Sequence, residues 1–228
     1  MILRTLLILT LLTSCGRPLS EAEMAFATKL QGDQLDLTRV RLVKGAPVDS
    51  VTYRRKARPR VTCRERILPP AKDEVVTVSP AAVTLFNKVF FTKNWYTDNY
   101  MPAYPERLYL SEAMLVAHEL THVWQWQNRK RTGYHPLRAA VEHGSSDDPY
   151  LFDLSQAPDF LDYGYEQQGA IVEEYVCCRA LAPDAARTKR LHAMLKGAFP
   201  VADLPRDGKR ESDVYLPWKD AKIAGICA

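Results

Sequence analysis

The spacing of hydrophobic and polar positions changes along the chain and separates a strand-rich part from a helical part. After residue 33, apolar residues come in short runs rich in β-branched and aromatic side chains, which is typical of strands. From Ser111 onward they recur at helical spacing. The expected strands cover residues 40–43, 51–53, 75–78 and 83–91, and Asn87-Lys88 is expected to form a tight turn or a bulge inside the last one.

The helical part predicts three helices and one long connection. The first helix is expected over residues 111–127, with Ser111 as its N-cap. Pro136, Gly144 and Pro149 then mark a long connection before a second helix at about residues 164–180 and a third at about 185–195. A shorter helical pattern lies within residues 18–33. Because no internal repeat is visible, we expect one folded domain.

The amino-terminal residues differ from the rest and predict export. Arg4 precedes an apolar stretch at residues 6–12, and Leu-Thr-Ser-Cys at 12–15 resembles the lipobox of bacterial lipoproteins. This resemblance implies a signal peptide at 1–14, a lipidated Cys15 that anchors the protein to a membrane, and a linker with a short helix at 15–35. Gly16 in the next position implies the outer membrane, on its periplasmic side. A plain secretory signal with an incidental cysteine is the alternative.

Composition and charge fit a globular domain with one unusual basic segment. The chain is 46% hydrophobic and 25% charged, with a formal net charge of +4. In an exported protein, nucleic acid is not an expected partner. The segment is therefore either a contact for anionic envelope polymers or lipid headgroups, or a charged loop or strand edge. Its basic residues are Arg54, Arg55, Lys56, Arg58, Arg60, Arg64 and Arg66.

Four cysteines remain after Cys15, and an even number permits disulfides in an exported protein. Cys177 and Cys178 are adjacent in a predicted helix, so their side chains point about 100° apart. They are therefore expected to bond separately to Cys63 and Cys227 rather than to each other. Free buried thiols are the alternative.

The strongest chemical signal is His118-Glu119-Leu120-Thr121-His122 in the first long helix. Residues four apart share a helical face, so both imidazoles can reach one metal ion. Glu119 is turned away from His118 and lies beside the metal, where it can accept a proton from a water molecule. Neutral imidazoles suit Zn²⁺, which lowers the pKa of bound water to near 7. The pattern therefore predicts a zinc-dependent hydrolase.

A catalytic zinc site usually has three protein ligands, so a third is expected elsewhere. No histidine follows His122 at short spacing, since the next six residues are Val-Trp-Gln-Trp-Gln-Asn. A ligand on a second packed helix would be held rigidly, which favours Glu166 or Glu173. The candidates together are His135, His143, Glu166, Glu173 and Glu174.

Two segments resemble a bacterial family of zincin-like metallopeptidases described as Vgr-related or DUF4157-like. They are Ala-His-Glu-Leu-Thr-His-Val-Trp-Gln at 117–125 and Glu-Gln-Gln-Gly-Ala-Ile-Val at 166–172. The resemblance covers roughly residues 85–180 and implies that Glu166 is the third ligand. The family helix usually has an acidic residue four positions after the ligand, where this chain has Ala170. Glu173, two turns after Glu166, either replaces that second partner of the histidine or is itself the ligand.

These observations lead to one expected function and to two alternative functions. We expect an α+β, zincin-like domain at 36–228, with a small β-sheet packed on the helix of His118 and a second helix that supplies the third ligand. The expected activity is that of an envelope-attached metallopeptidase acting on peptides, envelope proteins or peptidoglycan cross-links. An inactive zincin-like binding protein and an accessory protein of a secretion system are the alternatives. The candidate donors to a transition-state oxyanion are Tyr163, Tyr165, His135 and His143.

Overall fold

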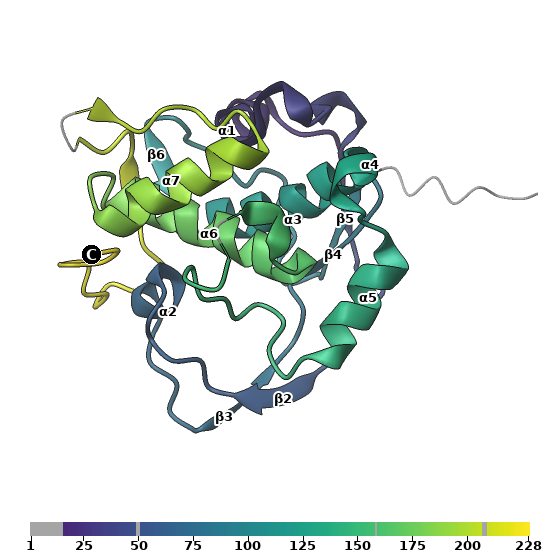
Figure 1. Cartoon of the computed structure of the whole chain (residues 1–228), viewed down its shortest axis with the longest axis horizontal. Coiled ribbons are helices and arrows are strands. Elements are labelled where there is room, and N and C mark those ends of the chain that lie inside the picture. The colour runs from purple at the N-terminus through teal and green to yellow at the C-terminus, as the bar shows by residue number, and fades with distance from the viewer. Residues whose placement is uncertain (1–15, 49–50, 158, 207–208) are drawn as a thin grey trace, which may run out of the picture.

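The computed structural model describes residues 16–48, 51–157, 159–206 and 209–228, which form a mixed α+β fold (Figure 1). The expected signal peptide and Cys15 lie outside these residues. The helices are α1 (Glu21–Gln31), α2 (Cys63–Ile67), α3 (Leu110–Gln127), α4 (Arg129–Thr132), α5 (Pro136–Ser145), α6 (Tyr165–Leu181) and α7 (Ala186–Ala198), with 3₁₀ turns η1 (Gly32–Gln34), η2 (Leu37–Arg39) and η3 (Phe160–Asp162). Within the described residues, no helix has the length and apolar character needed to cross a membrane.

The strands form three small sheets. The central sheet has the order β1 (Arg41–Lys44), β5 (Lys88–Phe91), β4 (Ala82–Leu85), with β1 parallel and β4 antiparallel to β5. A separate antiparallel pair, the β2–β3 hairpin, joins β2 (Tyr53–Lys56) to β3 (Val75–Val78) through a long connection that contains α2. A parallel pair joins β6 (Arg107–Tyr109) to β7 (Asp213–Tyr215). In Figure 1 the β2–β3 hairpin extends away from the helical centre, on the same side as α5.

The core lies where α3 packs against α6 and the central sheet. Trp124 of α3 is fully buried and contacts Phe199, which follows α7, edge to face. Ile171 and Tyr175 of α6 are also fully buried. Because α3 and α6 are buried along most of their length, their side chains are fixed relative to one another, and this is the frame on which the site is built.

Most elements confirm the sequence predictions, and the differences have local causes. Strands near 40–43 and 75–78 and helices near 111–127, 164–180 and 185–195 are present. The expected strand at 83–91 is two strands, because the chain turns at Phe86-Asn87 with Phe86 at φ 60°. Ser111 is not the N-cap, since α3 begins one residue earlier and directly continues β6.

Three helices, α2, α4 and α5, were not predicted from the sequence. The expected long connection after α3 contains α5, whose start is marked by Pro136 at its first position and by the His135 side chain, which accepts from the Leu137 N–H. The basic segment contains α2, a single turn capped by Thr62. It escaped pattern analysis because five residues are too few to show helical periodicity.

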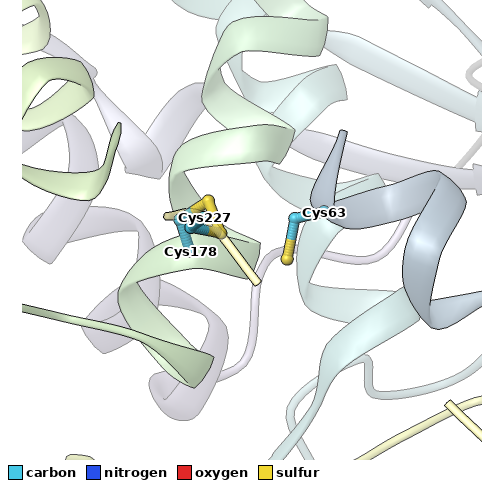
Figure 2. A group of neighbouring side chains, drawn as sticks. All are labelled: Cys63, Cys178 and Cys227. Atoms are coloured by element: carbon cyan, nitrogen blue, oxygen red, sulfur yellow. A yellow bond between two sulfur atoms is a disulfide. The ribbon is translucent and has the colours of Figure 1, made fainter. Parts of the chain in front are cut away.

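Two disulfides fasten α6 to the rest of the chain. Cys63 of α2 bonds to Cys177, and Cys178 bonds to Cys227. The expectation that the adjacent cysteines pair separately with Cys63 and Cys227 is confirmed. Figure 2 shows the Cys178–Cys227 bond beside Cys63, where α6, α2 and the carboxyl-terminal segment meet. The first crosslink thus holds α2 against one end of α6, and the second holds the carboxyl-terminal segment there.

Glu23 ties the amino-terminal segment to the core. Its buried carboxylate accepts from both terminal nitrogens of Arg17 at 2.7 Å and from the N–H groups of Ser20 and Tyr100. Burial alone would raise the pKa of Glu23, but these donors outweigh burial and lower it. The carboxylate is therefore stabilised in its charged form.

We predict that Glu23→Gln lowers the free energy of unfolding by about 3 kcal/mol at neutral pH, because it leaves Arg17 without its charge partner. Since the folded-state pKa is lowered, the stabilisation by Glu23 is fully present above the ordinary value of 4.5 and is lost as the pH falls through the lowered pKa. Urea unfolding at several pH values measures both effects. Asp203→Asn, which breaks the exposed pair with Lys196, should change stability much less, because solvent screens that pair. Equal effects of the two variants would contradict the prediction.

Candidate metal centre

Helix α3 places His118, Glu119 and His122 side by side in its buried middle. All three are nearly inaccessible to solvent. The two histidines are one turn apart, and their Nε2 atoms lie 3.1 Å from each other. Burying two imidazole nitrogens this close together costs free energy, because each nitrogen loses its hydration, so hydrophobic packing alone does not account for the arrangement. Their convergence therefore marks a polar site inside the core.

Helix α6 supplies a carboxylate to the same point. Glu166 Oε2 lies 3.1 Å from His118 Nε2 and 3.3 Å from His122 Nε2. The ligand atoms of these three residues form a group that can hold a metal ion. Burial alone would raise the pKa of Glu166, but the two histidines lower it well below its ordinary value. Glu166 is thus held as a carboxylate that faces both imidazoles.

Gln125 orients the second histidine. Its Oε1 lies 2.8 Å from His122 Nδ1, while its Nε2 donates to Gln168 Oε1 and to the carbonyl of Tyr165. The amide oxygen can only accept, so it places the His122 proton on Nδ1. The Nε2 lone pair of His122 is then free to bind an ion.

Glu173, held by Arg64, faces the Nδ1 side of the first histidine. Glu173 Oε1 lies 3.3 Å from His118 Nδ1, and its other oxygen accepts from Arg64 of α2 at 2.7 Å. Burial alone would raise the pKa of Glu173, but Arg64 and His118 lower it to about 2. Glu173 lies on the Nδ1 side of His118 and Glu166 on the Nε2 side. Geometry therefore groups Glu166 with the two Nε2 atoms and places Glu173 on the other side of the His118 ring.

The neighbours of His118 also set its proton affinity. Burial alone would lower the pKa of His118, but Glu166 and Glu173 outweigh burial and raise it to about 10. Glu119 has the opposite balance, because burial raises its pKa and His118 and His122 offset only part of that rise. Glu119 accepts a hydrogen bond of 2.7 Å from Thr84 of β4. Its carboxyl group is thus fixed beside the imidazoles with a raised pKa, as suits a proton acceptor.

A close approach of α6 to α3 allows this grouping. Gly169 faces His118, and a Cβ atom placed there would lie 2.6 to 2.8 Å from three atoms of the imidazole ring. Such distances are shorter than van der Waals contact between these atoms, so the Cβ of any other residue at position 169 would clash with the imidazole ring. The glycine is required by packing and not by backbone conformation.

The site opens into a cleft of about 550 Å³. One wall is the edge strand β4 with α3, and the opposite wall contains residues of β2, β3, α5 and the connection after α5. The cleft is large enough for a peptide segment. Its lining near the metal-binding group includes His118, Glu119, His122, Tyr134, His143, Tyr150, Glu166 and Glu173.

Only one of the four predicted oxyanion donors lines this cleft, His143. The Tyr163 hydroxyl bonds to the carbonyls of Asp153 and Ala157. The Tyr165 hydroxyl donates to the carbonyl of Gly133, and His135 is used to cap α5. Packing turns the polar groups of Tyr163, Tyr165 and His135 to backbone partners, and none of these three residues lines the cleft. Glu174, a further ligand candidate, instead pairs with Arg187 and accepts from the Cys63 N–H.

Sequence reasoning missed Tyr150 and Tyr134. The Tyr150 ring lies 5.7 Å from the His118 ring, and its hydroxyl lies 3.1 Å from His143 Nε2. The Tyr134 ring is stacked 6.2 Å from the His122 ring. Burial raises the pKa of both phenols, so they stay protonated and can donate. Neither carried a sequence signal, since each comes from a connection whose path only the fold determines.

Comparison with known proteins gives one relative and one similar solved structure. The chain is 25% identical over 187 residues to the type VI secretion system spike protein VgrG2b of Pseudomonas aeruginosa. The match covers 82% of this chain but only 15% of that protein. The solved effector domain of P. aeruginosa VgrG2b matches with a TM-score of 0.48 at 22% identity, over 81% of this chain and 84% of that one. No family model matches. The chain is therefore related in sequence to one part of a secretion-system spike protein.

Proposed function

We propose that this protein is a zinc-dependent peptidase with a zincin-like active site, in which His118, His122 and Glu166 hold the metal ion. The observation that carries the proposal is the convergence of three ligand atoms from α3 and α6, with the carboxyl group of Glu119 beside them. The three atoms are separated by 3.1, 3.1 and 3.3 Å. Ligands about 2.0–2.1 Å from a tetrahedral zinc ion are about 3.3–3.4 Å apart, so the donor set fits zinc.

In this proposal the chain's own residues handle the proton. A bound zinc ion would act as a Lewis acid on the substrate carbonyl and lower the pKa of water. Glu119, held by Thr84, accepts the proton of the attacking water and returns it to the leaving amine. Its raised pKa, which arises mainly from burial, favours the first of these transfers, in which Glu119 accepts the proton. Gln125 and Glu173 keep the two imidazoles in the required orientation.

Tyr150 is the proposed donor to the oxyanion that forms on the substrate carbonyl. It lies in the cleft near His118, and its hydroxyl pairs with His143, which was expected in this role from the sequence. The Arg58 guanidinium lies 5.0 Å from the centre of the Tyr150 ring and holds the ring in place. His143 and Tyr150 together thus supply a polar group on the cleft wall that faces α3.

The similarity to VgrG2b supports a second element of the proposal, a role connected with a secretion system. A module of such a system that binds metal without catalysis is the alternative function. Retention of a buried glutamate beside the ligand group favours the enzyme, because a structural metal site needs ligands only. All four cysteines of the described residues are in disulfides, so none closes the site as a further ligand. Attachment to the envelope through Cys15 stays a prediction.

We predict that the purified protein contains about one zinc ion and cleaves denatured proteins, and that Glu119→Gln keeps the zinc but loses activity by a factor of about 10³. Elemental analysis measures the zinc, and gel or mass-spectrometric detection of fragments measures cleavage. A chelator should abolish cleavage, and added zinc should restore it. Zinc in both proteins without cleavage by either would support the binding module instead.

We predict that Glu166→Gln and Glu173→Gln differ in zinc affinity. Loss of Glu166 removes a ligand, so zinc should be lost during dialysis. Loss of Glu173 removes only the partner of His118 Nδ1, and affinity should fall by about 10- to 100-fold. Titration of the metal-free variants with zinc gives both constants. A larger loss for Glu173→Gln would show that the two roles are reversed.

We predict that Gly169→Ala weakens zinc binding by at least about tenfold, because the added methyl group displaces the His118 ring. Gly197→Ala in α7 is the matched control, since a Cβ there meets no atom within 4 Å. The control should bind zinc normally and gain up to about 1 kcal/mol of stability from its better helix propensity. Equal zinc affinity for both variants would contradict the packing argument.

A further inference from the structure

The inner face of the β2–β3 hairpin presents Arg55 to the cleft. Side chains alternate along β2, so Tyr53 and Arg55 line the cleft, whereas Arg54 is exposed on the other face. Arg55 is paired in register with Val76 of β3. In Figure 1 this hairpin lies near the lower end of α5, and residues of both elements line the cleft. The basic segment seen in the sequence is therefore partly a cleft wall.

The other two cleft arginines already have carboxylate partners. Arg64 pairs with Glu173 at 2.7 Å. Arg58 binds both oxygens of Asp148, at 2.6 and 2.9 Å, and lies 3.6 Å from Glu65. These two guanidinium groups are thus neutralised by residues that also shape the fold.

Arg55 is much less compensated. Its side chain is only 16% exposed, and its carboxylate partner within the described residues is the same Asp148 group, at 4.0 Å, which already binds Arg58 through both oxygens. One of its N–H groups donates to the carbonyl of Lys56. Burial and repulsion by Arg58 lower the pKa of Arg55, which shows that its charged form is in an unfavourable environment.

A substrate carboxylate would correct this imbalance. The planar guanidinium offers paired N–H donors that match the two oxygens of a carboxylate. The lining of the cleft also includes apolar residues such as Val48, Ile67 and Val78, so the attraction would be weakly screened once a substrate fills the cleft. A neutral substrate group would leave the charge of Arg55 without a carboxylate of its own.

We propose that Arg55 recognises a carboxylate of the peptide substrate, either an Asp or Glu side chain near the scissile bond or the peptide's own carboxyl terminus. This inference rests on the proposed peptidase function and deepens it. The first source makes the protein an endopeptidase selective for acidic sites. The second makes it a peptidase that cuts at a fixed distance from the chain end.

The test is cleavage-site mapping on a peptide library made by tryptic digestion of a proteome, with fragments identified by mass spectrometry. Wild-type cut sites should be enriched in Asp or Glu at one position, or should cluster at one distance from the carboxyl terminus. Arg55→Gln should reduce kcat/KM for the favoured peptides by about tenfold or more, and that for their neutral or amidated counterparts by less than twofold. Arg54→Gln, on the outer face of β2, is the matched control and should behave as wild type.

The outcomes separate the two proposals. Cleavage with no carboxylate preference, or an equal effect of Arg54→Gln and Arg55→Gln, overturns the role of Arg55 and leaves the peptidase intact. Absence of cleavage by the zinc-loaded wild type overturns the peptidase. Arg55→Lys, which keeps the charge, should retain part of the preference and guards against a misfolded glutamine variant.

A binding measurement tests the role of Arg55 without catalysis. The same library is passed over immobilised, zinc-loaded Glu119→Gln protein, and the retained peptides are identified. Carboxylate-containing peptides should be enriched over their amidated or glutamine counterparts. Introducing Arg55→Gln into the Glu119→Gln protein should remove the enrichment, and introducing Arg54→Gln should not. Unchanged enrichment with Arg55→Gln would overturn the inference whatever the activity.

Discussion

The close packing of α6 on α3 is the constraint on which the rest of the structure depends. Three ligand atoms can meet only if two helix backbones approach closely, and at Gly169 the approach leaves no room for a side chain beside His118. The surrounding core is fully buried, so the helices cannot separate without exposing apolar surface. The site is therefore a consequence of core packing and is as rigid as the core.

Residues from distant parts of the chain hold the histidines in one orientation. Gln125 and Glu173 each contact a Nδ1 atom, and Arg64 fixes Glu173 from α2. Arg64 follows Cys63, which is bonded to Cys177 near the end of α6. A short helix that would be unstable alone is thus held by a covalent bond at the place where its arginine is needed. The Cys63–Cys177 disulfide and the Arg64–Glu173 ion pair therefore both help to hold Glu173 beside His118.

The cleft wall opposite α3 has a different character from this frame. The β2–β3 hairpin, α5 and the connection after it are joined by Arg58, Asp148, His143 and Tyr150 more than by a continuous apolar core. Polar contacts of this kind position side chains while leaving a cavity between the elements. Such a wall suits substrate recognition, whereas the α3–α6 pair suits the chemistry proposed for the metal.

The sequence by itself determined the features that depend on residues close together in the chain. The one-turn spacing of His118 and His122, the glutamate between them and the helical course of α6 follow from periodicity. Helix geometry also indicated that the adjacent cysteines do not bond to each other, whereas the structure decided which partner each one has. Only the tertiary structure decided that Glu166 faces the ligand group, that Glu173 orients His118 with Arg64, and that Tyr150 rather than Tyr163 or Tyr165 lies in the cleft. The physical reason is that a side chain's direction within a helix is set by local geometry, whereas its partner on another element is set by how the whole core packs.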